Sequence, residues 1–401
     1  MMEKPILVVS DVSAETVHGG AERMLTQHVR ALVKAGIRIA ILTRQPNPEA
    51  TLVQELTDGV MEYRLPWSGD RGWRGLRELK KAARDWWQTH DDLFAGVIAE
   101  QPFVMWALMK AGCRLPRLQV NYSFAFEEYT TRHALDWHMR HALAAAAMRR
   151  LEAGVYGSAS HLLVLSDYSR RRLAEEFGTD SARVTIAFGG AVPARPELLA
   201  QREVLRGELG WDKPVVVTLR NLVPRTGVDL LVQAAAILKH DMPELRWCVI
   251  GAGALLEPLK AFAEALGIAD RIEFTGFLSE RETQRRLAAA DMFMLPTRSL
   301  EGFGLVTVEA NMFGLPVVAT PVGAIPEVAP ALPCNRLAAD ASPLALARAL
   351  RATWRDISAM DRDAMRTELR QAAEAKFGWE HHDAILLDCV RRLFGNGAGK
   401  A

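Results

Sequence analysis

Cysteine is scarce in this chain of 401 residues. The four cysteines, Cys113, Cys248, Cys334 and Cys389, lie far apart and form no CxxC pair. Zinc ribbons and disulfide frameworks need clustered cysteines, so neither is expected. This usage fits a reducing, cytoplasmic setting.

An excess of charge of either sign is also missing, because 49 Lys and Arg side chains face 48 Asp and Glu side chains. A nucleic-acid partner is therefore not expected. No apolar run approaches the roughly 18 residues of a membrane span, and the start MMEKPILVVSD reaches an acid too early for a signal peptide. We expect a cytoplasmic protein that could meet a membrane only peripherally, at its inner face.

Two common nucleotide-binding motifs are absent. In VIGAGALLEPL, Leu256 stands where a dinucleotide fingerprint has its third glycine. No Walker sequence occurs either, which disfavours an ATPase. His381 and His382 have no acidic or thiol neighbour at ligand spacing, so no metal site is expected.

Short β-rich runs alternate with helical stretches along most of the chain. The first half opens with a strand at 5–11, a helix at about 21–35 and a strand at 37–43; the second opens with a strand at 214–221 and a helix at 228–240. Further strands are expected at 161–167, 183–190, 247–253, 271–276, 291–296 and 315–320. Strands this apolar suit parallel sheets that helices cover on both faces. The predicted fold class is α/β, with two Rossmann-like, doubly wound parallel-sheet domains facing a cleft.

The polar, proline-bearing segment that follows residue 190 marks the domain boundary. We expect an N-terminal domain over 1–195 and a C-terminal domain over 196–375. Ligands of such folds bind beyond the carboxyl ends of the strands, so the loops at those ends are the places to search for a site.

Paired glycines, Gly19 and Gly20, stand between the first strand and the first helix. Glycines at a helix N-terminus let backbone N–H groups approach an anion. A plain turn is the alternative, since paired glycines often precede helices.

The stretch EGFGLVTVE at 301–309 is more specific. Gly302 and Gly304 precede a helix that is expected to start near Leu305, and its first N–H groups can receive phosphate or sugar oxygens. Glu309 then lies about 6 Å further along the helix axis, where it can accept two hydrogen bonds from a ribose diol. Glu301 precedes the turn and is expected to face the ligand. In the alternative interpretation Glu301 only stabilises the helix dipole and Glu309 is solvated.

A diphosphate also needs cations. Arg220 and Arg225 lie around the exit of the strand at 214–221, and a guanidinium group matches phosphate geometry bidentately.

Several stretches together resemble the family 4 glycosyltransferases (glycosyl transferases group 1), which have the two-domain GT-B fold. The stretches are HGGAER (18–23), LVPRTGVDLL (222–231), GAG (251–253), RIEFTGFLS (271–279), EGFGLVTVEA (301–310), GLPVVATPVGAIPEV (314–328) and FGWE (377–380). The glutamates reproduce the family's E-x7-E arrangement. The resemblance also implies that the terminal helix, 376–396, returns to the first domain.

The resemblance implies transfer of a sugar from a nucleotide-diphosphate donor to a hydroxyl acceptor, with retention of configuration and without metal or other cofactor. We expect Arg220 and Arg225 to act in catalysis with Glu301, which by this resemblance is the glutamate beside the donor sugar. The resemblance assigns ribose binding to Glu309. It assigns the other donor contacts to Gly19, Gly20, Asn221, Thr226, Gly302, Phe303, Gly304, Leu305 and Val306. The N-terminal domain becomes the acceptor side and the C-terminal domain the nucleotide-sugar side.

The chain departs from the family pattern at three places. Asn221 and Thr226 stand where the family usually has an arginine and a lysine. The N-domain histidine is missing from VNYSFAFEEY, so Asn121, Tyr122 and His133 are the acceptor-side candidates. A catalytically degenerate nucleotide-sugar-binding protein is therefore the alternative function.

A basic, tryptophan-bearing stretch, GWRGLRELKKAARDWWQ at 72–88, can lie on an anionic membrane. The alternative is an ordinary helix that packs Leu76, Leu79, Ala83 and Trp86 on the core and leaves its basic side chains in water.

Overall fold

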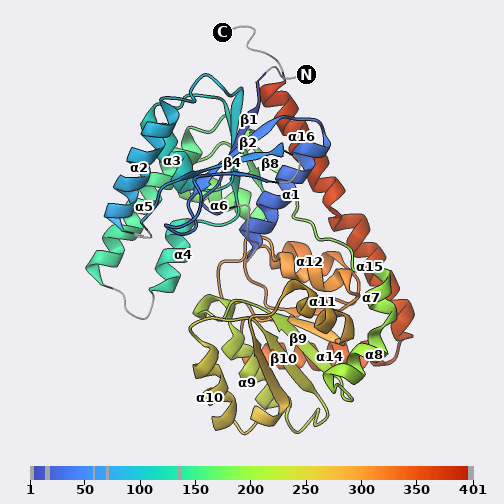
Figure 1. Ribbon diagram of the computed structural model, residues 1–401. Helices are drawn as coiled ribbons and strands as arrows, with labels where there is room; N and C mark the ends of the chain where they lie inside the picture. The colour runs from blue at the N-terminus through green and yellow to red at the C-terminus, as the bar shows by residue number, and fades with distance from the viewer. Residues whose placement is uncertain (1–3, 14–18, 57–58, 69–71, 134–137, 396–401) are drawn as a thin grey trace. The chain divides into compact units, whose positions relative to one another are not determined.

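The computed structural model describes residues 4–13, 19–56, 59–68, 72–133 and 138–395 (Figure 1). The chain forms two compact units. The first contains the residues up to Thr130, the segment that ends at Phe188 and the segment from Glu380 on, and the second contains Gly189–Trp379 together with a short stretch that begins at Thr131. The boundary predicted at residue 195 falls inside the second unit, which already begins at Gly189.

The first unit is built on a sheet with the strand order β3-β4-β2-β1-β5-β6-β7-β8. Its strands are β1 Ile6–Val9, β2 Ile39–Arg44, β3 Val53–Glu55, β4 Met61–Leu65, β5 Gly96–Ala99, β6 Arg117–Asn121, β7 His161–Val164 and β8 Val184–Ile186. Neighbouring strands pair in parallel, except for β3, which is antiparallel to β4. Its helices are α1 Gly20–Lys34, α2 Trp73–Trp87, α3 Pro102–Ala111, α4 Ala125–Arg132, α5 Met139–Gly157, α6 Asp167–Phe177 and α16 Trp379–Phe394.

Helices cover both faces of this sheet, which is why its strands read as continuous apolar runs. Leu7 and Val9 of β1 pack with side chains of α2, α3 and α5 on one face. Ile6 and Val8 pack with side chains of α1 and α16 on the other. Because side chains alternate along a strand, both sets are buried.

The second unit has an all-parallel sheet in the order β11-β10-β9-β12-β13-β14. Its strands are β9 Val215–Leu219, β10 Arg246–Ile250, β11 Ile272–Gly276, β12 Met292–Leu295, β13 Val317–Ala319 and β14 Arg336–Leu337. Its helices are α7 Pro196–Ala200, α8 Arg202–Leu209, α9 Val228–Leu238, α10 Leu256–Ala265, α11 Glu280–Ala289, α12 Leu305–Met312, α13 Ile325–Val328, α14 Pro343–Ser358 and α15 Arg362–Phe377. Two parallel-sheet domains of this kind confirm the α/β class and the division into two Rossmann-like halves.

The strand order reverses direction once in each sheet. From β9 the chain moves outward to β10 and β11 and then returns to β12 on the other side. In the first unit the same reversal occurs between β1 and β5. Ligands of open α/β sheets bind at the carboxyl ends of the strands beside such a switch point.

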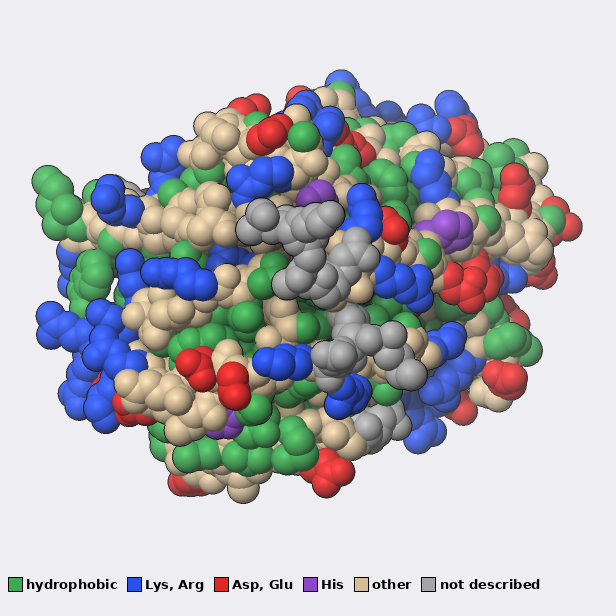
Figure 2. Space-filling model, turned by 90° about the horizontal axis from the view of Figure 1, so that it is seen from above, with side chains coloured by type: hydrophobic (Ala, Val, Ile, Leu, Met, Phe, Trp, Pro, Cys, Tyr) green, Lys and Arg blue, Asp and Glu red, His purple; other side chains and the backbone are tan. Residues whose placement is uncertain are grey.

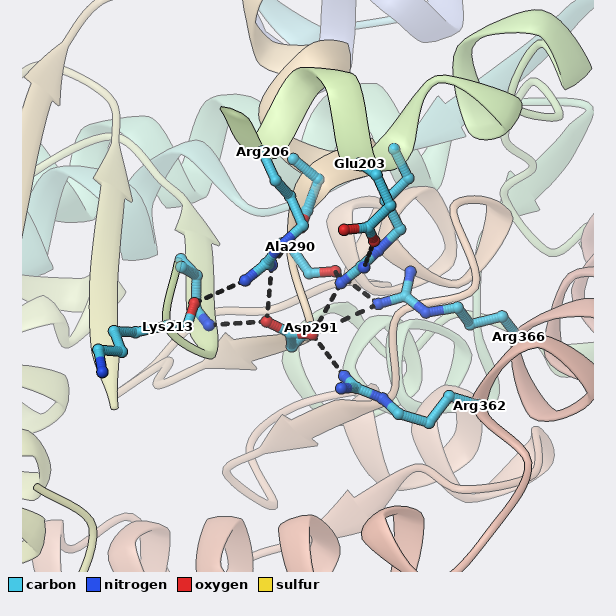
Figure 3. Close-up of polar contacts among 10 residues, drawn as sticks. Glu203, Arg206, Lys213, Ala290, Asp291, Arg362 and Arg366 are labelled. Atoms are coloured by element: carbon cyan, nitrogen blue, oxygen red, sulfur yellow. Dashed lines mark hydrogen bonds and ion pairs between the residues drawn. The ribbon is translucent and has the colours of Figure 1, made fainter. Parts of the chain in front are cut away.

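The opposite, amino end of β12 carries a buried aspartate. Asp291 is 2% exposed and accepts a hydrogen bond from the Val215 N–H at 2.8 Å. Its carboxylate meets guanidinium groups from α8 and α15, namely those of Arg202, Arg206, Arg362 and Arg366 (Figure 3). Burial opposes ionisation, but the arginines outweigh it and hold the pKa of Asp291 below its usual value. This cluster of charges holds α8 and α15 against the amino end of β12, the end opposite the switch-point loops.

No helix among the described residues is long and apolar enough to cross a membrane.

Candidate active site

The loops that follow β9 and β12 meet at the switch point of the second sheet. Gly227 adopts a φ of +68°, and a Cβ there would lie 2.0 Å from the Pro296 carbonyl oxygen, so the loops touch through backbone alone. The Arg225 carbonyl accepts hydrogen bonds from the N–H groups of Arg298 and Ser299 at 2.9 and 3.2 Å. The spacing between the loops is therefore fixed by main-chain contacts.

A buried ion pair joins the two loops. Arg220, directly after β9, donates through Nη2 to Glu301 Oε2 at 2.8 Å and to Thr297 Oγ1 at 3.1 Å. Thr297 also donates to Glu301 Oε2, at 3.2 Å. The side chains of Arg220 and Glu301 are 8% and 13% exposed. Arg220 Nε is buried and has no hydrogen-bond partner among the described residues, so the guanidinium group retains one unsatisfied donor.

Contacts with residues 323–325 fix the conformation of the turn after Glu301. Gly304 is the N-cap of α12 with a φ of +86°, and a Cβ there would lie 2.5 Å from Ile325 Cδ1. The Glu301 carbonyl accepts a hydrogen bond from the Ala324 N–H at 2.9 Å, and a Cβ on Gly323 would lie 2.2 Å from the same oxygen. Gly304 has no side chain with which to cap α12, and the Thr307 N–H donates to the Gly304 carbonyl at 2.8 Å, so the N–H groups of Leu305 and Val306 are the ones that can turn toward a ligand oxygen.

The other residues of EGFGLVTVE lie in this turn or in the helix that follows it. Phe303 is 2% exposed and packs edge-on against Phe377 with centroids 5.8 Å apart, so only its backbone can serve a ligand. Leu305 and Val306 begin α12, and Glu309 lies one turn further on and is partly exposed. Helix α12 begins at Leu305, as predicted.

Thr226 and Asn221, which stand where the family usually has a lysine and an arginine, have different structural roles. Thr226 is 2% exposed, and its hydroxyl lies 2.7 Å from the carbonyl oxygens of Asn221 and Val223. It closes the loop and brings no positive charge. Asn221 is exposed, while Arg225 donates through Nη1 to the Leu300 carbonyl at 3.3 Å. The β9 loop therefore offers two guanidinium groups, and only that of Arg220 reaches the Glu301 carboxylate.

Of the acceptor-side candidates, Asn121 and Tyr122 lie in the first unit, whereas His133 is grouped with the second. Asn121 is 1% exposed and donates to the Tyr156 hydroxyl at 2.9 Å. Tyr122 is partly buried and donates to Glu100, whereas His133, just after α4, is partly exposed. Gly19 is the N-cap of α1, and Gly20 is its first residue. The ligand roles of these residues remain predictions.

The sequence analysis missed the importance of Glu100, His28 and His382. All three are at most 1% exposed and form one hydrogen-bonded group. His28 stands on the apolar stripe of α1, and Glu100 directly follows the apolar strand β5. A charged residue at the carboxyl end of a buried strand was the available signal.

Helix α2 packs as an ordinary surface helix. Leu79, Ala83 and Trp87 are buried, and Trp86 is partly buried against Tyr63 and His90. Trp73 is 65% exposed, and basic side chains line the outer face. Lys and Arg side chains gather at the left of Figure 2, the side on which α2, α4 and α5 lie in Figure 1. A membrane contact of this face remains a prediction.

Comparison with known proteins identifies the family. Residues 201–375 match the family described as glycosyl transferases group 1, and residues 18–195 match glycosyltransferase family 4. The chain belongs to the family 4 glycosyltransferases.

Relatives of this family 4 member have several different names. The GDP-mannose-dependent alpha-(1-6)-phosphatidylinositol monomannoside mannosyltransferase of Mycolicibacterium smegmatis is 34% identical over 202 residues, 49% of this chain and 52% of that protein. The D-inositol 3-phosphate glycosyltransferase of Mycobacterium sp. (strain KMS) is 32% identical over 210 residues, 47% of this chain and 46% of that protein. The chain thus matches about half the length of these relatives.

Solved structures share the whole fold at low identity. Sucrose-phosphate synthase from Thermosynechococcus elongatus has a TM-score of 0.82 at 20% identity and covers 98% of this chain and 100% of its own. Anabaena HepE in complex with UDP and glucose has a TM-score of 0.74 at 18% identity, with the same coverage. The GT-B fold follows from these matches.

Proposed function

We propose that this chain transfers a sugar from a nucleotide-diphosphate donor to a hydroxyl acceptor, with retention of anomeric configuration and without metal. The observation that carries the proposal is the buried Arg220–Glu301 pair beside the uncapped N-terminus of α12. A carboxylate, a guanidinium group and helix N–H groups converge there at the switch point of the second sheet.

Each group has a task in the proposed reaction. The leaving diphosphate gains negative charge in the transition state, and the α12 N–H groups and Arg220 stabilise that charge in a preorganised way. Arg225 adds a second cation from the same loop. Glu301 orients the donor sugar, and Glu309 accepts hydrogen bonds from the ribose hydroxyls. The positive charge that a metal would supply is thus provided by the protein.

The donor and acceptor classes follow from the relatives' names. Because the M. smegmatis relative is named as GDP-mannose-dependent, GDP-mannose is the first donor to test. HepE was solved with UDP, so uridine donors come next. The acceptor we propose is a polyhydroxylated glycan, lipid-linked or small molecule, reached from the cytoplasm with α2 lying against an anionic membrane.

One observation favours a second candidate, a degenerate nucleotide-sugar-binding protein. Thr226, at the place of the family's lysine, is buried and its hydroxyl is engaged by backbone carbonyls. It therefore gives no cation to the diphosphate. A chain of this kind would bind the donor without transferring its sugar.

The first experiment measures thermal stabilisation by GDP, UDP, ADP and TDP, each with EDTA, on wild type and Glu309→Ala. A ligand at about 100 times its Kd stabilises the folded state by about 2.7 kcal/mol. We expect one nucleotide to raise the Tm and Glu309→Ala to abolish the shift. Glu264→Ala, an exposed glutamate of α10, is the matched control and should keep it.

Transfer is then followed with the matching donor and a panel of acceptors, with and without EDTA, and the anomeric configuration of the product is read by NMR. An inverted product would refute retention, and loss of turnover in EDTA would refute metal independence. A nucleotide shift without any transfer would favour the degenerate binder.

A further inference from the structure

A chain of hydrogen bonds crosses the first unit from a tyrosine hydroxyl to a backbone carbonyl. Tyr122 Oη donates to Glu100 Oε2, and Glu100 Oε1 lies 2.8 Å from His28 Nδ1. His28 Nε2 lies 2.8 Å from His382 Nε2, and His382 Nδ1 lies 3.0 Å from the Phe188 carbonyl oxygen.

This series of hydrogen bonds begins at the end of the unit where a ligand is expected to bind. Glu100 directly follows β5 and Tyr122 directly follows β6, at the carboxyl end of the sheet and beside its β1/β5 switch point. The three inner groups are sealed from water, since Glu100, His28 and His382 are 1%, 0% and 1% exposed. Tyr122 alone is partly exposed.

The two imidazole rings meet edge to edge. Their planes differ by 10° and their centroids are 5.0 Å apart, while the facing nitrogens are 2.8 Å apart. The centroid distance equals the nitrogen–nitrogen distance plus the distance from each ring centre to its own nitrogen. The two rings therefore lie nearly in one plane and are not stacked face to face. This is the geometry of an N–H···N hydrogen bond.

The four hydrogen bonds of this series together need one proton more than their side chains carry in their usual protonation states. Each of the four contacts needs one proton. A tyrosine hydroxyl and two neutral imidazoles supply one each, and a carboxylate supplies none. A fourth proton must therefore be present, because without it two lone pairs would face each other at hydrogen-bond distance in a dry interior.

The direction of each bond follows from the Phe188 carbonyl, which can only accept. His382 Nδ1 therefore carries a proton. Burial, reinforced by the neighbouring His28, lowers the pKa of His382 to about 3, so this ring is neutral and its Nε2 accepts from His28. The extra proton then lies between His28 Nδ1 and Glu100 Oε1.

We propose that Glu100, His28 and His382 are positioning residues, which hold one shared proton and thereby fix the Tyr122 hydroxyl as a hydrogen-bond acceptor for a substrate hydroxyl. Tyr122 donates its only hydroxyl proton to Glu100, so toward any further partner its oxygen can only accept. The link to turnover rests on the proposed glycosyl transfer. The proton count does not.

Asp383 is a further ionisable group beside this series of hydrogen bonds. Asp383 of α16 interacts electrostatically with His28 and with Lys34 of α1, and it accepts a hydrogen bond from Gln27 at 2.8 Å. Burial raises the pKa of Asp383. The same groups remain when Glu100 alone is changed, so a Glu100 variant isolates the shared proton.

Glu100→Gln is the decisive variant. A glutamine amide can accept from Tyr122 through its oxygen and donate to His28 Nδ1 through its nitrogen, which satisfies all four contacts without an extra proton. Glu100→Ala satisfies neither. Selective 15N labelling of histidine reads the protonation of each ring nitrogen, and His28→Gln and His382→Gln assign the signals.

In wild type we expect a protonated Nδ1 and a bare Nε2 on His382, and on His28 a protonated Nε2 with an Nδ1 that shares a proton. In Glu100→Gln, His28 Nδ1 should become a bare acceptor. Bare Nε2 atoms on both His28 and His382 in wild type would overturn the proton count, whatever the enzyme does, because no proton would then lie between the two rings.

Activity tests the positioning role. Tyr122→Phe and Glu100→Ala should each lower kcat about tenfold, the worth of one hydrogen bond, and the double variant should be no worse than either. Glu100→Gln should recover most of the activity lost in Glu100→Ala, and its pH–rate profile should lack one ionisation that wild type shows. Additive losses, or wild-type kcat in Tyr122→Phe, would refute positioning. A missing nucleotide shift would instead refute the proposed function and leave the NMR result standing.

Discussion

Replacing Asp291 with alanine removes the carboxylate that holds α8 and α15 to the amino end of β12. Arg366 is 6% exposed and would be left as a buried cation with a weakened set of partners. Breaking a buried ion pair from one side costs about 3–5 kcal/mol. The Val215 N–H also loses its acceptor, which adds about 1–3 kcal/mol. We expect Asp291→Ala to lower the free energy of unfolding of the second unit by at least about 4 kcal/mol.

Urea unfolding followed by circular dichroism measures this loss, and Asp356→Ala is the control. Asp356 pairs with Arg336 at 2.6 Å, but the two side chains are 37% and 42% exposed, so its removal should cost under about 1 kcal/mol. Asp291→Asn keeps an acceptor for Val215 and should lie between the two. If Asp291→Ala unfolds within about 1 kcal/mol of Asp356→Ala, the arginine cluster does not fasten the helices and the reasoning is wrong.

Three further predictions concern the site and the first unit. Arg220→Ala should lower turnover and destabilise the fold by about 3 kcal/mol, because it leaves Glu301 buried without its partner; urea unfolding and kcat check this, and wild-type values for both would contradict it. Gly227→Ala should cost about 2 kcal/mol or more and reduce the nucleotide-induced Tm shift, because its Cβ would lie 2.0 Å from the Pro296 oxygen, whereas Gly207→Ala, with open space around it in α8, should be neutral or stabilising. Burial raises the pKa of Glu152 to about 7 from 4.5, so its contribution to stability is complete below pH 4.5 and declines by about 3 kcal/mol as pH rises through 7. Glu152→Gln should flatten that dependence in urea titrations, and an unchanged slope would refute the assignment.

Patterns local in the sequence predicted much of the fold. The apolar strands, the helical stripe of α1 and the start of α12 at Leu305 could all be predicted because periodicity and glycine act within a few residues. The turn EGFG was predicted for the same reason, and the positive φ of Gly304 matches it. Strands β4, β5 and β6 were not predicted, because their place in the sheet is decided by pairing with strands distant in the sequence.

The sequence by itself determined the α/β class, the two halves and the two glutamates at the helix that opens the candidate site. Only the tertiary structure decided which arginine pairs with Glu301, since the sequence alone makes Arg220 and Arg225 equally good candidates for that ion pair. It also decided that Glu100 and His382 meet His28 across 72 and 354 residues. The reason is physical. Local propensity depends on neighbours in the chain, whereas hydrogen bonds and ion pairs depend on distances that exist only after both sheets are assembled.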